Sequence, residues 1–76
     1  MYKIVKDKQP FQVVGSTMAF TIPYSTTATL YMSADGVNYY PYEQQIKAPD
    51  TIIVNGCVTD MYFYIDGIND DLKVLI

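Results

Sequence analysis

Several residue types on which enzymes rely are scarce or missing in this chain. It has no histidine, and Cys57 is its single cysteine. Histidine is the most common general base and metal ligand, and a thiol protease pairs its cysteine with histidine. A lone cysteine also excludes an intramolecular disulfide and a cysteine-based metal site. We therefore expect a non-enzymatic protein that needs no cofactor or metal. An enzyme would have to draw its acid and base from carboxylates such as Glu43, Asp50 and Asp60.

Positive charge is scarce as well. The chain has five lysines and no arginine, against eight acidic residues, and its formal net charge is −3. Nucleic acids need clustered cations, and arginine is favoured because it bonds phosphate through two hydrogen bonds at once. We therefore expect no nucleic-acid partner. Lysines at positions 3, 6 and 8 are typical of residues that solubilise an edge strand.

Long hydrophobic runs are missing too. No apolar stretch approaches the roughly 18 residues of a membrane-spanning helix, and residues 1–8 lack the apolar run of a secretory signal. The sequence thus predicts no membrane partner. It also predicts synthesis in a cytoplasm without export by the standard route.

Strand-forming residues are abundant, and glycine and proline interrupt them at short intervals. Half of the 76 residues are hydrophobic, and eight are tyrosine. This length predicts one domain, residues 1–76, whose modest core leaves a thin stability margin that oligomerisation could increase. The expected strands are 2–6, 11–14, 18–22, 27–32, 37–42, 51–54, 58–65 and 72–75. Seven or eight short antiparallel strands predict an all-β protein, a small β-sandwich of immunoglobulin-like or jelly-roll type.

The pair Asp35-Gly36 predicts a β-hairpin closed by a two-residue turn. This register pairs Tyr31 with Tyr40 and places Tyr42 on the same outward face, because side chains alternate along a strand. The inward residues of this region are then Met18, Phe20, Ile22, Ala28, Leu30 and Met32.

A second hairpin is expected near the C-terminus, with residues 67–70 as its loop. It pairs Ile65 with Leu72 and Phe63 with Val74 on the inner face, and turns Tyr62 and Tyr64 outward. A two-residue loop at residues 66–67 would instead bury a carboxylate without a partner.

Five outward tyrosines are the candidate binding residues. They are Tyr31, Tyr40, Tyr42, Tyr62 and Tyr64. Exposed tyrosine offers a large, rigid contact area together with a hydroxyl group, which suits an interface or a ligand platform. The alternative is that these rings form cross-strand pairs that only stabilise the sheet. Leu75 and Ile53, also outward in some strand registers, favour an interface.

The acidic segment 66–71 is the one candidate ion site in the sequence. Calcium takes several oxygen ligands from a tight loop, but the spacing of an EF-hand is missing here. Asp, Asn and Gly are also the ordinary residues of hairpin turns. We expect a plain turn, with a weak cation site as the alternative.

Residues 31–39 carry the pattern Y-x-S-x-D-G-x-x-Y. This pattern resembles a hairpin of discoidin-like and other jelly-roll modules and of immunoglobulin-like domains in bacteriophage virion proteins. The resemblance implies a virion accessory or decoration protein, made in the host cytoplasm, that binds capsid or tail subunits and can form a homo-oligomer. A carbohydrate-binding or adhesion module, in which tyrosines stack on sugar rings, is the alternative function.

Overall fold

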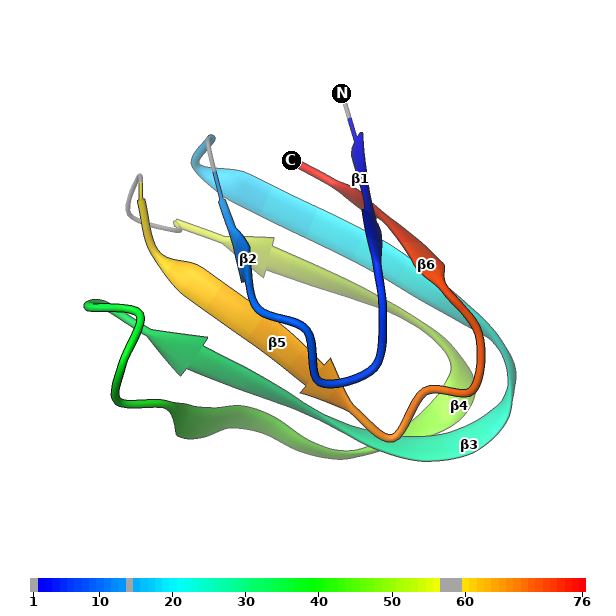
Figure 1. Cartoon of the computed structure of the whole chain (residues 1–76). Helices are drawn as coiled ribbons and strands as arrows, with labels where there is room; N and C mark the ends of the chain where they lie inside the picture. Colours follow the sequence, from blue (N-terminus) through cyan, green and yellow to red (C-terminus); the bar gives the residue numbers. More distant parts are fainter. Residues whose placement is uncertain (1, 14, 57–59) are drawn as a thin grey trace.

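The computed structural model describes residues 2–13, 15–56 and 60–76, and this part of the chain forms a single antiparallel sheet of six strands without a helix (Figure 1). The strands are β1 (Tyr2–Val5), β2 (Phe11–Gln12), β3 (Thr17–Ser33), β4 (Tyr40–Asn55), β5 (Tyr62–Asp66) and β6 (Leu72–Leu75). Their order in the sheet is β1-β6-β3-β5-β2, and β4 pairs with β3. The expected all-β antiparallel class is confirmed. The described residues form six strands, in place of the seven or eight expected, and residues 14, 58 and 59 of the expected strands 11–14 and 58–65 lie outside the described part.

The count differs because β3 and β4 are each longer than the sequence pattern predicted. The expected strands 18–22 and 27–32 are both parts of β3, and 37–42 and 51–54 contribute to β4. The ladder between β3 and β4 is interrupted only by register shifts, one of them between Ile22 and Thr26. The polar run that begins at Ser25 therefore bends a continuous strand and does not end it.

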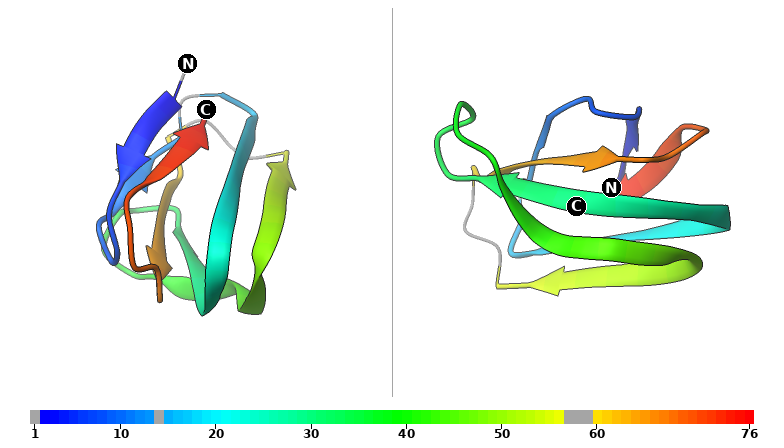
Figure 2. Two further views of the ribbon diagram at one scale, coloured as in Figure 1. Left: turned by 90° about the vertical axis from the view of Figure 1, so that its right-hand side faces the viewer. Right: turned by 90° about the horizontal axis from the view of Figure 1, so that it is seen from below.

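The sheet is folded back on itself. Strands β5 and β6 follow one another along β3, with β5 opposite residues 29–33 and β6 opposite Ala19 and Phe20. In the same way β1 pairs with β6, and β2 pairs with β5. Figures 1 and 2 show the long strands turning back at one side of the molecule, the right-hand side in Figure 1.

This bend divides the sheet into two halves. The first half consists of β1, β6 and the paired residues 17–22 of β3 and 50–55 of β4. The second half consists of β2, β5 and the paired residues 26–33 of β3 and 40–48 of β4.

The core lies between the inner faces of the two halves. Its buried residues are Val5, Phe11, Val13, Met18, Phe20, Ile22, Ala28, Leu30, Ile46, Val54, Phe63, Ile65, Ile68, Leu72 and Val74. The inward faces expected from alternation are confirmed along β3, except that Met32 is only partly buried. Alternation predicted these positions because a strand with one buried face repeats every two residues.

The expected C-terminal hairpin is wrong in its pairing. Ile65 lies opposite Leu30 and Phe63 opposite Met32, whereas Val74 lies opposite Phe20. Both β5 and β6 pair with β3, because residues 67–71 carry the chain past the bend without reversing its direction along β3. The inward side chains were identified correctly, since alternation is independent of which strand is the neighbour.

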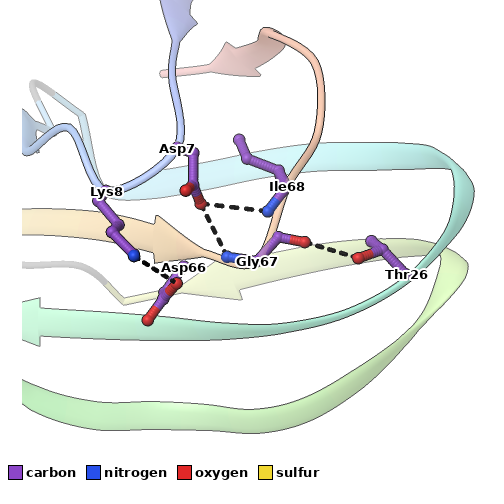
Figure 3. Close-up of polar contacts among 6 residues, drawn as sticks. All are labelled: Asp7, Lys8, Thr26, Asp66, Gly67 and Ile68. Carbon is purple, nitrogen blue, oxygen red and sulfur yellow. Dashed lines mark hydrogen bonds and ion pairs between the residues drawn. The ribbon is translucent and has the colours of Figure 1, made fainter.

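Side-chain hydrogen bonds hold the bend together (Figure 3). The Asp7 carboxylate accepts hydrogen bonds from the backbone N–H groups of Gly67 (2.8 Å) and Ile68 (3.2 Å). The Thr26 hydroxyl donates to the Gly67 carbonyl at 2.6 Å. Lys8 and Asp66 approach to 3.9 Å with both side chains largely exposed, a pairing worth little in water.

Tyr24 holds the other end of the same loop. Its hydroxyl accepts the N–H groups of Asn69 and Asp70, both at 2.9 Å, and donates to the Asp70 carbonyl at 3.1 Å. Gly67 has a φ of 109°, and a Cβ added there would collide with the Thr27 carbonyl oxygen. The bend therefore requires glycine at this position.

Candidate functional site

The five candidate tyrosines do not share one surface. Tyr31, Tyr62 and Tyr64 lie on the outer face of the second half, opposite the core residues of the same strands. Tyr40 pairs with Met32, and therefore lies on the other side of the sheet from Tyr31. The expected outward group of Tyr31, Tyr40 and Tyr42 is thus not formed.

The physical reason is a register change of one residue. Tyr31 pairs with Pro41, in place of the expected Tyr40, and strand β3 ends at Ser33 while β4 begins at Tyr40. Residues 34–39 therefore form a longer loop than the expected two-residue turn. Gly36 has a φ of 77°, and Asp35 is not in the positive-φ region that a type I′ turn would require at both positions. A slip of one residue moves every following side chain to the opposite face.

Three tyrosines pack against one another on the outer face of the second half, and we call them the tyrosine cluster: Tyr31, Tyr39 and Tyr64. The rings of Tyr31 and Tyr64 are stacked with centroids 4.6 Å apart. Tyr39 meets Tyr64 edge to face at 4.9 Å. All three side chains are half-buried, and desolvation raises the pKa of both Tyr39 and Tyr64 above the usual value.

A compact loop made of residues 34–39 positions Tyr39. The Ser33 hydroxyl donates to Asp35 at 2.8 Å and accepts the N–H of Gly36 at 2.9 Å. The Asp35 carboxylate also accepts the N–H groups of Val37 (2.8 Å) and Asn38 (2.9 Å). These hydrogen bonds, the one from the Asn38 backbone first, hold the pKa of Asp35 well below its usual range.

This loop folds back over its own sheet. A Cβ built on Gly36 would stand 3.3 Å from the Tyr62 ring, and Ser33 is only 2% exposed although it points outward. Tyr62 and Tyr64 are thus partly covered from within the chain. For Tyr31, Tyr62 and Tyr64 the geometry fits the alternative of packed rings that stabilise the sheet.

Tyr40 and Tyr42 have a different environment. Together with Val37 they lie at the hairpin end, which we define as residues 34–42, and their exposures are 66%, 47% and 78%. Every residue of β4 from Tyr40 to Gln45 is exposed, although the strand's side chains alternate between two faces. The hairpin end therefore presents aromatic and aliphatic surface to solvent at Val37 and Tyr40, and in part at Tyr42, which also lines a small cavity with Met32 and Phe63.

A cleft of about 420 Å³ opens beside the covering loop. Lys3, Gln12, Tyr39 and Tyr62 are among the residues that line it. The Lys3 ammonium group donates to the Gln12 carbonyl at 3.4 Å, and the Gln12 amide donates to Asp60 at 3.2 Å. Lys3 and Gln12 are therefore engaged in hydrogen bonds within the chain.

The outer face of the first half carries a second apolar surface. Cross-strand pairing aligns Tyr2 with Leu75, Leu75 with Ala19, and Ala19 with Ile53. We call these four residues the apolar row. Sequence reasoning had marked Leu75 and Ile53 as outward in some strand registers, and in the observed register they are 57% and 61% exposed. It had missed Tyr2, although the alternation of residues 2–5 was the available signal.

The acidic segment 66–71 has a structural role, because its residues form hydrogen bonds at the bend of the sheet. Its N–H groups bond to Asp7 and Tyr24, and Asp66 faces Lys8. Among residues 2–13, 15–56 and 60–76, no three Asp, Glu, Cys or His side chains gather in a way that could hold a metal ion. Cys57 lies outside the described residues.

Comparisons with protein-family models, with curated proteins and with solved structures found no match to this chain. In the described part of the chain, no helix is long and apolar enough to cross a membrane.

Proposed function

We propose that this chain is a non-enzymatic structural protein, a virion accessory or decoration protein that binds a capsid or tail surface. The observation that carries the proposal is the hairpin end, where Val37, Tyr40 and Tyr42 are exposed within six residues of one another. Exposed tyrosine next to aliphatic surface is characteristic of protein-binding sites, because it supplies contact area with little loss of side-chain entropy.

The proposal divides the five candidate tyrosines by role. Tyr40 and Tyr42 supply contact area to the partner, whereas Tyr31, Tyr62 and Tyr64 hold the hairpin in position. The loop that carries Val37 is braced by Ser33 and Asp35. A braced loop loses less freedom on binding, which raises affinity without adding a contact.

The virion setting rests on the resemblance of residues 31–39 to hairpins of bacteriophage virion proteins. An immunoglobulin-like or jelly-roll sandwich, the finer architecture expected from the sequence, belongs to the same proposal. Its support is that the two halves of the folded sheet enclose one core between them. Under this proposal the chain is made in the host cytoplasm and ends in the virion.

Co-sedimentation with particles from the same source tests the proposal. We expect wild-type chain to pellet with particles, and Tyr40→Ser/Tyr42→Ser to lose most of that binding because its contact area is removed. Lys47→Ser, an exposed position farther along β4, serves as the control and should still pellet. Binding that survives the double substitution, or a wild-type chain that stays in the supernatant, would contradict the proposal.

A carbohydrate-binding or adhesion module is the alternative, and it would use the same two exposed rings. Oligosaccharide titration should then change tyrosine fluorescence in the wild type but not in Tyr40→Ser/Tyr42→Ser. The structural proposal expects no change in either protein.

A further inference from the structure

The apolar row lies on the half of the sheet that no loop among residues 2–13, 15–56 and 60–76 covers. Tyr2, Leu75 and Ile53 are 54%, 57% and 61% exposed, and Ala19 lies between the latter two in the cross-strand alignment. Ile4, at 51%, extends the surface along β1. A contiguous apolar surface of this kind on a small monomer marks an interaction site.

Two charged side chains, Lys73 on β6 and Asp71 just before it, line the groove of this face. Of the outward side chains in the four strand segments of the first half, Lys73 alone is charged, and its ammonium group lies 5.0 Å above the Tyr2 ring. The chain as a whole has a net charge of −3. Each copy therefore brings one positive and one negative side chain, Lys73 and Asp71, to this face, so contact between two copies does not set only like charges against each other.

The apolar row is also complementary to itself in shape. Leu75 and Ile53 stand on either side of Ala19 and line a groove of about 400 Å³ above it. A two-fold axis parallel to the strands, between β6 and β3, lays β6 of one copy over β3 of the other. Leu75 of each copy then enters the groove over Ala19 of the other, so both contacts form at once.

We propose that the chain forms a two-fold symmetric homodimer by stacking the outer faces of the first halves through the apolar row. Four strand segments of four to six residues, spaced about 4.8 Å apart and rising about 3.3 Å per residue, give a projected area of about 300 Å² per copy. Stable complexes bury about 800 Å² per partner, so this interface is small. The dimer is therefore weak and forms only at high concentration.

This surface is distinct from the hairpin end, so the inference does not depend on the proposed function. Tyr40 and Tyr42 belong to the second half and stay uncovered in the dimer. A dimer with two free hairpin ends can bridge two neighbouring sites on a repetitive surface, which increases the strength of attachment through avidity.

Sedimentation velocity of the full chain tests the dimer without any particle. Between about 10 µM and about 1 mM, the range for an interface of this size, the average mass should rise from 8.6 kDa towards twice that value. Leu75→Lys should lower the association constant at least about tenfold, because it places a charge in the groove of the second copy. Val37→Lys, the same type of change at the hairpin end, should leave the association unchanged.

Ile53→Lys on β4 provides a second test of the same face, and circular dichroism checks that each variant is folded. If Leu75→Lys fails to fold, Ile53→Lys decides the question. A wild-type chain that stays at 8.6 kDa near 1 mM would overturn the dimer. So would equal loss of association in Val37→Lys, or growth past the dimer without limit, since a two-fold contact closes after two copies.

Discussion

The outer faces of the two halves belong to one folded sheet, but one face is covered and the other is exposed. On the second half, loop 34–39 folds back over the sheet, and the tyrosine cluster is packed and half-buried. On the first half nothing among the described residues covers the apolar row, and three of its four side chains are more than half exposed. Composition alone would suggest the reverse, because tyrosines are expected at interfaces and aliphatic residues in cores. What distinguishes the two faces is whether the chain supplies a loop to cover them.

The bend connects the two halves of the sheet, so its disruption should lower the free energy of unfolding the most. Gly67→Ala should lower the free energy of unfolding by about 3 kcal/mol, because alanine is strained at this φ and its Cβ meets the Thr27 carbonyl oxygen. Urea denaturation monitored by circular dichroism measures the loss. Gly56→Ala is the matched control, since Gly56 also has a positive φ but nothing within 4 Å of its Cβ position. It should cost only about 1 kcal/mol, and equal losses would mean that the collision does not matter.

Truncation on each face tests the contrast between them directly. Tyr64→Ala should cost about 2 kcal/mol, because it removes the stack with Tyr31 and the edge contact with Tyr39. Leu75→Ala on the open face should change the free energy of unfolding by less than about 0.5 kcal/mol when measured at concentrations where the chain is monomeric. Chemical denaturation of both variants provides the comparison. Similar losses for the two would show that the faces do not differ in packing.

Acid should loosen the covering loop in a modest, pH-dependent way. Hydrogen bonds from Asn38, Val37 and Ser33 lower the pKa of folded Asp35, so the folded state favours the carboxylate. Its stabilising contribution is therefore present above the unfolded value near 3.9 and is lost as the pH falls through the lowered folded pKa.

Asp35→Asn against wild type measures this contribution. The difference in unfolding free energy should be largest near neutral pH and should shrink in strong acid, where wild-type Asp35 also becomes protonated. Asp71→Asn removes one negative charge at an exposed position just before β6 and controls for net charge. A difference between Asp35→Asn and wild type that stays constant across this range would contradict the role of the carboxylate.

The sequence was a good guide to local properties. Alternation identified Phe20 and Ile65 as inward and Leu75 as outward, and these assignments hold even where the strand partners were wrong. The pair Asp35-Gly36 correctly marked the hairpin connection between β3 and β4. These features follow from the pleat and from local turn chemistry, neither of which depends on distant residues.

Local sequence patterns did not predict which strands pair or in which register. Ser33 hydrogen-bonds to Asp35, and together they widen the connection to six residues, which moves Tyr40 to the face opposite Tyr31. Asp7 bonds to the N–H groups of Gly67 and Ile68, sixty residues away, and helps to guide the loop past the bend. No local pattern contains a contact of that separation, so the expected C-terminal hairpin was drawn between strands that pair with β3 and not with each other.

By itself, the sequence determined an all-β chain with a hairpin connection near Asp35-Gly36, a set of inward side chains and an abundance of outward tyrosine. Each of these is a property of a few neighbouring residues. Only the tertiary structure decided that the sheet folds back on itself, that its own loop covers the tyrosines on one half, and that Tyr2, Ala19, Ile53 and Leu75 align across four strands on the other. The physical reason is that coverage and alignment arise between strands, from hydrogen-bond register and from contacts such as that of Asp7 with Gly67.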